Sequence, residues 1–374
     1  MKRVLILMGR YLPGHRDGGP LRTIANVVEA LGDEYRFFIA CLDRDHGDEA
    51  PYPGVRVNEW NRVGKAEVYY VPPGGFSDAL LLKLAEGMDS VYLCSFYEDY
   101  GYRMLLLKKS GRIRIPVTVA SMGVFSKEAL AQKSVKKKLF INGCRLAGLF
   151  RNVTWSVTSE LEAADLKRVL GDGARCVVAE DLPRGSIPGR RKRTEHDVLR
   201  AVFLSRICAH KGLDVAIRAI RDSGVPCCFT VCGPVQEPDY WEDCRKALDG
   251  MDWRYLGDIP GEQVQEILSE QDVLLLPTRS ENYGHVIFEA MSVGCVPIVS
   301  DQTPWGILAE RGAGYVVRRD VGQFAHALSE FAALERKEQD AMADRAVLLA
   351  EEKLEQSKRQ TGYKTIFDLS AEDV

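Results

Sequence analysis

Two glutamates eight residues apart lie in a segment whose residue types suit sugar binding. The wholly apolar run Val273–Leu276 predicts a buried strand, and the polar residues from Thr278 to His285 predict a loop that leads into a helix. Glu281 then lies on the loop, and Glu289 lies in the first turns of the helix. A carboxylate in this position can accept hydrogen bonds from two sugar hydroxyls at once. Glu289 alone fits a helix-dipole partner equally well, so the interpretation depends on the whole arrangement.

The backbone of the same segment can bind phosphate. Residues at a helix N-terminus point their N–H groups outward, and the helix dipole favours an anion there. The residues in this position are Asn282, Tyr283, Gly284 and His285. We therefore expect a diphosphate beside the two glutamates.

A second strand end supplies positive charge. The apolar run from Leu199 to Leu204 predicts a strand, and Arg206, Lys211 and Gly212 follow it. Cationic side chains can neutralise a diphosphate leaving group without a metal ion. Each cation alone is a weak signal, because surface arginine and lysine are common. Their position at a strand end of the same domain favours a binding site.

A glycine pair near the start of the sequence is a third candidate. Gly18 and Gly19 follow the first predicted strand, Val4–Met8, and precede a predicted helix over 21–31. Glycine lets a ligand approach the backbone closely, although a plain loop explains the pair equally well. The sequence contains neither a Walker loop nor a dinucleotide fingerprint at this point.

We expect no metal site. The six histidines show no ligand spacing, and the ten cysteines form no Cys-x-x-Cys pair. Buried thiols in a reducing compartment explain the cysteines. One Asp-x-Asp, Asp43-Arg44-Asp45, has the form of a metal-binding motif. It follows the second predicted strand, far along the sequence from the strand ends that carry Arg206, Lys211 and Glu281, and is interpreted as a chance match.

The length and the apolar pattern predict the domain organisation. A chain of 374 residues exceeds one ordinary core, and apolar strand-like runs alternate with amphipathic stretches. This pattern is typical of an α/β fold with doubly wound parallel sheets. We expect an N-terminal domain over 1–182, a linker over 183–198, a second domain over 199–350, and a C-terminal helix over 351–374 that packs back toward the first domain.

Charge and hydropathy bear on location and partners. No apolar run reaches the ~18 residues of a spanning helix, and the first one is too short for a signal peptide, so we expect a cytoplasmic protein. Net charge is −3, and no nucleic-acid partner is expected.

Residues 103–151 nevertheless hold twelve basic residues and one acid, Glu128. Basic and apolar residues interleave there as on a basic amphipathic helix: Lys133, Lys136, Lys137, Lys138, Arg145 and Arg151 with Leu139, Phe140, Ile141, Leu146, Leu149 and Phe150. This pattern predicts contact with an anionic membrane or a phosphate-bearing acceptor; the alternative is a core helix with a solvated basic face.

Taken together, these motifs resemble glycosyltransferase family 4, the large retaining "group 1" family, and within it the bacterial members that build surface polysaccharides. The family's Glu-x7-Glu motif matches Glu281 and Glu289, its Arg and Lys-Gly match Arg206 and Lys211-Gly212, and its N-terminal glycine loop matches Gly18-Gly19. The resemblance covers nearly the whole chain and is strongest over 273–305. It implies the GT-B architecture, in which two Rossmann-like doubly wound domains face each other across a cleft.

The resemblance also implies an activity. A sugar would move from a nucleotide-diphosphate donor, with UDP favoured over GDP, to a glycan or lipid-linked acceptor, with retained configuration and without a metal or cofactor. Glu281 would bind donor-sugar hydroxyls and Glu289 the ribose, while Arg206 and Lys211 would bind the diphosphate. Two segments depart from the family pattern. Ser121-Met122-Gly123 stands where members carry Pro-Arg-Gly or a nearby histidine, and Asp181-Leu182-Pro183 stands where an asparagine is usual. No acceptor-side base is therefore assigned.

Two other functions compete with this one. A GT-B-fold epimerase would act on a nucleotide sugar without an acceptor, and a catalytically silent partner would bind a glycan or stabilise another transferase. The presence of both carboxylates and both cations favours an active enzyme. The cleft motifs show few of the further acids and histidines expected of an epimerase.

Overall fold

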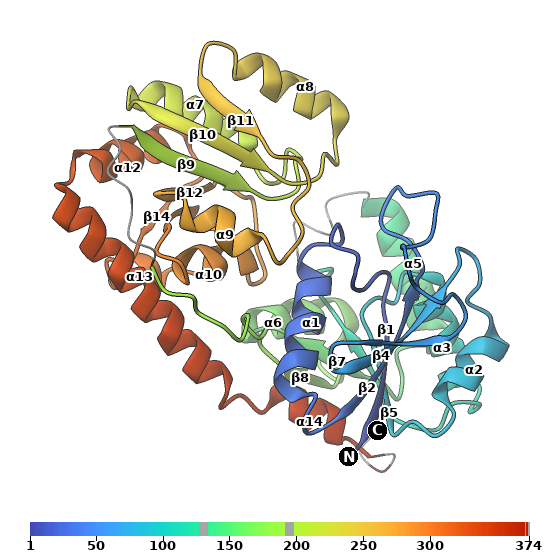
Figure 1. Cartoon of the computed structure of the whole chain (residues 1–374). Coiled ribbons are helices and arrows are strands. Elements are labelled where there is room, and N and C mark those ends of the chain that lie inside the picture. Colours follow the sequence, from blue (N-terminus) through green and yellow to red (C-terminus); the bar gives the residue numbers. More distant parts are fainter. Residues whose placement is uncertain (127–129, 131–133, 191–197, 371, 373–374) are drawn as a thin grey trace. The chain divides into compact units, whose positions relative to one another are not determined.

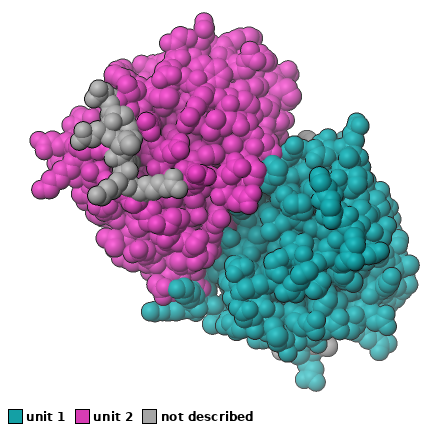
Figure 2. All heavy atoms as spheres, in the orientation of Figure 1, with its two compact units in different colours: residues 1–182, 358–374 teal, residues 183–357 magenta. Residues whose placement is uncertain are grey.

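The chain forms two compact units in the computed structural model, which describes residues 1–126, 130, 134–190, 198–370 and 372. Unit 1 consists of Met1–Leu182 together with Lys358–Val374, and unit 2 consists of Pro183–Ser357 (Figure 2). The end of the sequence therefore belongs with its first half. Each unit is an α/β sandwich around one sheet (Figure 1).

The sheet of unit 1 has the strand order β3-β4-β2-β1-β5-β6-β7-β8. The edge strand β3 pairs antiparallel with β4, and the other neighbours pair in parallel. From the central strand β1 the chain first builds one side and then the other, so the order reverses between β1 and β5. The strands are β1 (Arg3–Leu7), β2 (Arg36–Leu42), β3 (Trp60–Val63), β4 (Ala66–Val71), β5 (Ser90–Leu93), β6 (Val117–Ala120), β7 (Thr154–Val157) and β8 (Cys176–Val178).

Helices cover both faces of this sheet because successive strand residues point to opposite sides. Val4 and Ile6 of β1 belong to a core that includes α1 and α14, whereas Leu5 and Leu7 belong to a core that includes α2, α3, α5 and α6. The helices are α1 (Gly19–Leu31), α2 (Asp78–Ala85), α3 (Asp99–Lys109), α5 (Ser134–Leu146), α6 (Glu160–Leu170) and α14 (Gly362–Asp368).

Unit 2 is a second doubly wound fold, with the strand order β11-β10-β9-β12-β13-β14. All of these strands pair in parallel. Its strands are β9 (Leu199–Leu204), β10 (Cys227–Cys232), β11 (Asp252–Tyr255), β12 (Val273–Leu276), β13 (Val296–Ser300) and β14 (Tyr315–Val317). Its helices are α7 (Leu213–Ser223), α8 (Pro238–Ala247), α9 (Val264–Ser269), α10 (His285–Met291), α11 (Ile307–Glu310), α12 (Val321–Ala333) and α13 (Arg336–Ser357).

Two of the expected boundaries differ in the structure. The segment predicted as a linker over 183–198 belongs to unit 2 where it is described, because Arg184 donates to Gly261 O at 3.0 Å and Arg190 donates to Asp344 at 3.0 Å. Proline and glycine exclude regular structure there, but they do not exclude packing. The helix predicted over 351–374 is instead the end of α13 followed by the separate α14. Gly362 at the start of α14 lies so close to β8 that a Cβ would be 2.3 Å from Val178 O.

Candidate nucleotide-sugar site

The candidate donor site lies at the carboxyl end of the sheet in unit 2. Strand β9 pairs with β10 on one side and with β12 on the other, and the strand order reverses between β9 and β12. Doubly wound sheets bind their ligands at such a reversal, outside the carboxyl ends of the strands. The loops that leave β9 and β12 carry the predicted residues Arg206, Lys211 and Glu281.

Lys211 and Glu281 meet directly between these two loops. Lys211 Nζ lies 2.5 Å from Glu281 Oε1, and the two side chains are 10% and 13% exposed. A cation and a carboxylate are thus in contact at the edge where the sequence predicts a diphosphate and its sugar. An anion that takes Lys211 must compete with Glu281 for it, so the two predicted roles are physically coupled.

His210 joins the two loops beside this ion pair. Its Nε2 lies 3.3 Å from Ser280 O and 3.2 Å from Ser280 Oγ. Burial and the neighbouring Lys211 lower the pKa of His210 below its ordinary value. A neutral imidazole therefore ties the loop after β9 to the loop after β12 at neutral pH.

Arg319 is a member of the site that sequence reasoning missed. It follows β14, and its Nε donates to Pro277 O at 2.8 Å, where β12 ends. Burial and the neighbouring Arg279 lower the pKa of Arg319 below its ordinary value. The available signal was its position just after a short apolar strand, the same signal that marked Arg206 and Lys211.

Arg206 lies on the same loop as Lys211 but is exposed. Its Nη1 donates to Gln236 Oε1 at 3.1 Å, beyond the end of β10. The structure therefore brings Lys211 and Glu281 into contact and places Arg206 on the side of the loop toward β10.

The predicted phosphate-binding segment forms the N-terminus of α10. Gly284 is the N-cap with φ 76°, and a Cβ there would lie 2.9 Å from the Ile287 side chain. Trp305 Nε1 donates to Tyr283 O, which fixes the backbone next to the cap. Asn282 is exposed, and His285 is the first residue of the helix. Glu289 is 5% exposed, so it is a buried carboxylate rather than part of a solvated helix face.

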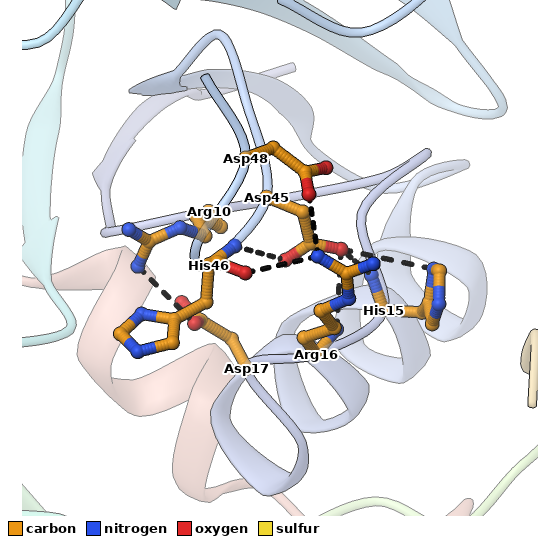
Figure 3. Close-up of polar contacts among 7 residues, drawn as sticks. All are labelled: Arg10, His15, Arg16, Asp17, Asp45, His46 and Asp48. Carbon is orange, nitrogen blue, oxygen red and sulfur yellow. Dashed lines mark hydrogen bonds and ion pairs between the residues drawn. The ribbon is translucent and has the colours of Figure 1, made fainter. Parts of the chain in front are cut away.

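The glycine loop of unit 1 lies at the reversal beside β1. Gly18 is the N-cap of α1 with φ 62°, and a Cβ on Gly19 would meet nothing within 4 Å. Asp45 fixes the loop before them (Figure 3). Its Oδ2 accepts from the backbone N of His15 at 2.8 Å and of Arg16 at 3.3 Å, and its Oδ1 accepts from His46 N at 2.8 Å.

Both aspartates of the Asp-x-Asp motif are occupied by contacts within the protein. The Asp43 side chain pairs with Arg44 at 2.8 Å, and the two aspartates are 2% and 3% exposed. Within the part of the chain that the structure describes, no group of three or more His, Cys, Asp or Glu side chains could hold a metal ion. Asp45 thus organises a loop, a role that sequence reasoning did not assign.

Comparison with solved structures shows what fold these two units form. HepE from Anabaena, solved with UDP and glucose, superposes with a TM-score of 0.73 at 14% identity, over 99% of this chain and 100% of that one. Sucrose-phosphate synthase from Thermosynechococcus elongatus superposes with a TM-score of 0.74 at 15% identity, over 98% of this chain and 96% of that one. WaaG, a glycosyltransferase of lipopolysaccharide biosynthesis, gives 0.66 at 15% identity, over 98% of each chain. The fold is that of the GT-B glycosyltransferases.

Sequence comparison narrows this class. Residues 190–347 match the model of the family described as glycosyl transferases group 1. The sulfoquinovosyl transferase of Arabidopsis thaliana is 28% identical over 99 residues, which is 26% of this chain but only 18% of that protein. The fold and the family match together support a GT-B glycosyltransferase.

Proposed function

We propose that this protein is a retaining, metal-independent glycosyltransferase of family 4 that moves a sugar from a nucleotide-diphosphate donor to a glycan or lipid-linked acceptor. The expected setting is the synthesis of a bacterial surface polysaccharide or glycoconjugate in the cytoplasm. The observation that carries the proposal is the Lys211–Glu281 pair between β9 and β12. It sets a phosphate-binding cation against a sugar-binding carboxylate, as a sugar joined to a diphosphate requires. UDP is the expected nucleotide, since HepE structures with a similar fold hold UDP and UDP-glucose.

In the proposed reaction the bond between the anomeric carbon and the diphosphate oxygen breaks, and the acceptor hydroxyl bonds to the same face of the carbon. Lys211 and Arg206 neutralise the leaving diphosphate. The leaving phosphate oxygen takes the acceptor's proton, so no separate base is required. Glu281 orients the sugar for attack.

A binding screen followed by a transfer assay tests the proposal. Thermal shifts against UDP- and GDP-sugars identify the donor, and the assay is then run with candidate acceptors in excess chelator. We expect sugar transfer to persist in chelator and proton NMR of the first product to show the donor's configuration. Conversion of the sugar without an acceptor would indicate an epimerase, and donor binding without turnover would indicate a silent partner. Activity that chelator abolishes and Mg²⁺ or Mn²⁺ restores would refute metal independence.

We further propose that α3 and α5 of unit 1 contact an anionic membrane. On α5, Leu139 is 67% and Leu146 is 85% exposed, and the exposed Lys136, Lys138 and Arg145 flank them. Exposed leucines among cations are typical of an interfacial helix, whereas a core helix with a solvated basic face has no need of them.

Helix α3 extends this apolar surface. Tyr102 and Leu106 are 37% and 41% exposed, and the Tyr102 ring lies 5.9 Å from that of Phe140 on α5. Ile141 and Leu149, predicted as part of the amphipathic face, are instead buried in the core of unit 1. Lys133 and Glu128 lie outside the described residues. None of the described helices is both long and apolar enough to span a bilayer.

Vesicle co-sedimentation tests this surface. Each cation near an anionic leaflet contributes about 1 kcal/mol, so binding to phosphatidylserine vesicles should exceed binding to neutral ones. Leu139→Ser with Leu146→Ser should weaken it, while Leu161→Ser on α6, which removes a leucine that is 77% exposed, should not. Equal binding to both vesicle types, or no binding to either, would leave only the alternative of a core helix with a solvated basic face.

A further inference from the structure

Met122 has an unusual backbone conformation for its residue type. Its φ is 45°, and the other non-glycine residues with positive φ in the described ranges are both asparagines, Asn58 and Asn152. Asparagine tolerates the left-handed region because its short side chain bonds locally, whereas methionine gains nothing there. Such strain persists only where the surrounding structure imposes it, and it is common at functional sites.

A buried carboxylate imposes this conformation. Glu162 is 8% exposed, and its Oε1 accepts from Ser121 Oγ at 2.6 Å and from Gly123 N. Its other oxygen accepts from Thr158 N at 2.6 Å and from Thr158 Oγ1 at 2.8 Å. One side chain therefore holds the residues on both sides of Met122 and ties them to the segment that enters α6.

Glu162 occupies a position that normally serves its own helix. Ser159 is the N-cap of α6 and its Oγ accepts from Glu162 N at 3.2 Å, so Ser159 and Glu162 have the spacing of a capping box. In a capping box the glutamate returns to the N-cap backbone. Here one oxygen of Glu162 binds Thr158, just before the N-cap, and the other reaches across to the loop after β6. Arg168 of the same helix donates to Phe125 O in that loop at 2.9 Å.

The loop lies where a ligand of unit 1 would bind. It leaves the carboxyl end of β6, the second strand on the far side of the β1–β5 reversal, on the same edge of the sheet as Gly18 and Gly19. We propose that Glu162 is a positioning residue that holds Ser121–Gly123 in the shape required for the acceptor to react. This inference rests on the proposed glycosyltransferase function, and it assigns a role to the segment that departs from the family pattern.

The test separates positioning from stability. Glu162→Gln keeps the size of the side chain but replaces an acceptor oxygen with a donor, and Ser121→Ala removes one of the four hydrogen bonds more mildly. We expect Glu162→Gln to lower kcat/KM for the acceptor by about tenfold or more, and Ser121→Ala to lower it less. Affinity for the bare nucleotide diphosphate, measured by calorimetry, should change less than about twofold, because unit 2 supplies that site.

Ser159→Ala is the matched control. It removes the cap of the same helix without touching the carboxylate, so it should lower the melting temperature while leaving acceptor kcat/KM near wild type. Met122→Gly in the Glu162→Gln background should restore part of the melting temperature but not the turnover, because glycine relieves the strain without fixing the loop. Wild-type acceptor kinetics in both Glu162→Gln and Ser121→Ala would overturn the inference alone. No transfer by the wild-type protein with any donor and acceptor would overturn the proposed function and this inference together.

Discussion

The carboxyl edges of the two sheets use acidic residues in opposite ways. In unit 2 the carboxylate of Glu281 meets the ammonium of Lys211, and both retain some exposure. In unit 1 the carboxylates of Asp45 and Glu162 accept from backbone N–H groups and are nearly buried. Unit 2 keeps a charged pair partly exposed, as the proposed donor site requires, whereas unit 1 uses charge internally to shape its loops. Two doubly wound sheets can therefore place acidic side chains at equivalent edges for different purposes.

The largest expected effect falls on the charged edge of unit 2. Glu281→Gln should lower turnover by about ten- to a hundredfold, because hydrogen bonds to a charged group contribute roughly 1.5–3 kcal/mol. Bare-nucleotide affinity should stay the same or rise, since Lys211 loses its competitor. Glu289→Ala should instead weaken nucleotide binding itself. Calorimetric titration beside steady-state kinetics measures both. If Glu281→Gln abolished nucleotide binding and Glu289→Ala did not, the two roles would be exchanged.

A second effect tests whether unit 2 also depends on positioning. Arg319→Met removes the donor to Pro277 O, so the loop that carries Glu281 should loosen and turnover should fall by about tenfold. Arg318→Ala, at the exposed neighbouring arginine, is the control and should behave as wild type. Equal turnover in Arg319→Met and Arg318→Ala would show that Arg319 does not position this loop, and positioning residues would then be restricted to unit 1.

A smaller effect is expected at the glycine loop of unit 1. Asp45→Asn loses charge-assisted bonds to His15 N and Arg16 N, which should cost about 1–3 kcal/mol of unfolding free energy. Asp48 belongs to the same cluster but pairs with the Arg16 side chain and is 43% exposed, so Asp48→Ala should cost under about 1 kcal/mol. Chemical denaturation measures both. A larger loss of unfolding free energy for Asp48→Ala than for Asp45→Asn would contradict the role given to Asp45 in shaping this loop.

The last expected effect concerns pH. Burial raises the pKa of Asp181 in unit 1 from 3.8 to about 7. A carboxyl whose folded pKa is raised stabilises the fold below its unfolded pKa, and that contribution is lost as pH rises toward 7. Between pH 4 and 8 the melting temperature of Asp181→Asn should therefore fall less than that of wild type, by about a few degrees. Glu180→Gln changes an exposed neighbour and should retain the wild-type slope. Identical slopes in wild type and Asp181→Asn would contradict this assignment.

Sequence patterns predicted the α/β class and the doubly wound sheets, because buried parallel strands leave continuous apolar runs. They also placed Lys211 and Glu281 at strand ends, where adjacent parallel strands bring side chains together. The roles of Asp45 and Glu162 escaped, because each depends on a loop about 30 to 40 residues away in sequence that only the tertiary fold brings near. Asp45 was seen only as part of a chance metal motif. The spacing of Ser159 and Glu162 fits a capping box, but nothing in the sequence indicates that the Glu162 side chain binds Ser121.

The return of the chain to unit 1 has a consequence for biosynthesis. Tyr363, Ile366 and Phe367 of α14 are 4%, 1% and 1% exposed and complete the core on the α1 face of the first sheet. Unit 2 is continuous in sequence, whereas α14 follows the whole of unit 2 in the chain. Unit 1 therefore cannot complete this core until the residues of unit 2 have been synthesised, and until then it keeps an apolar face that a chaperone could bind.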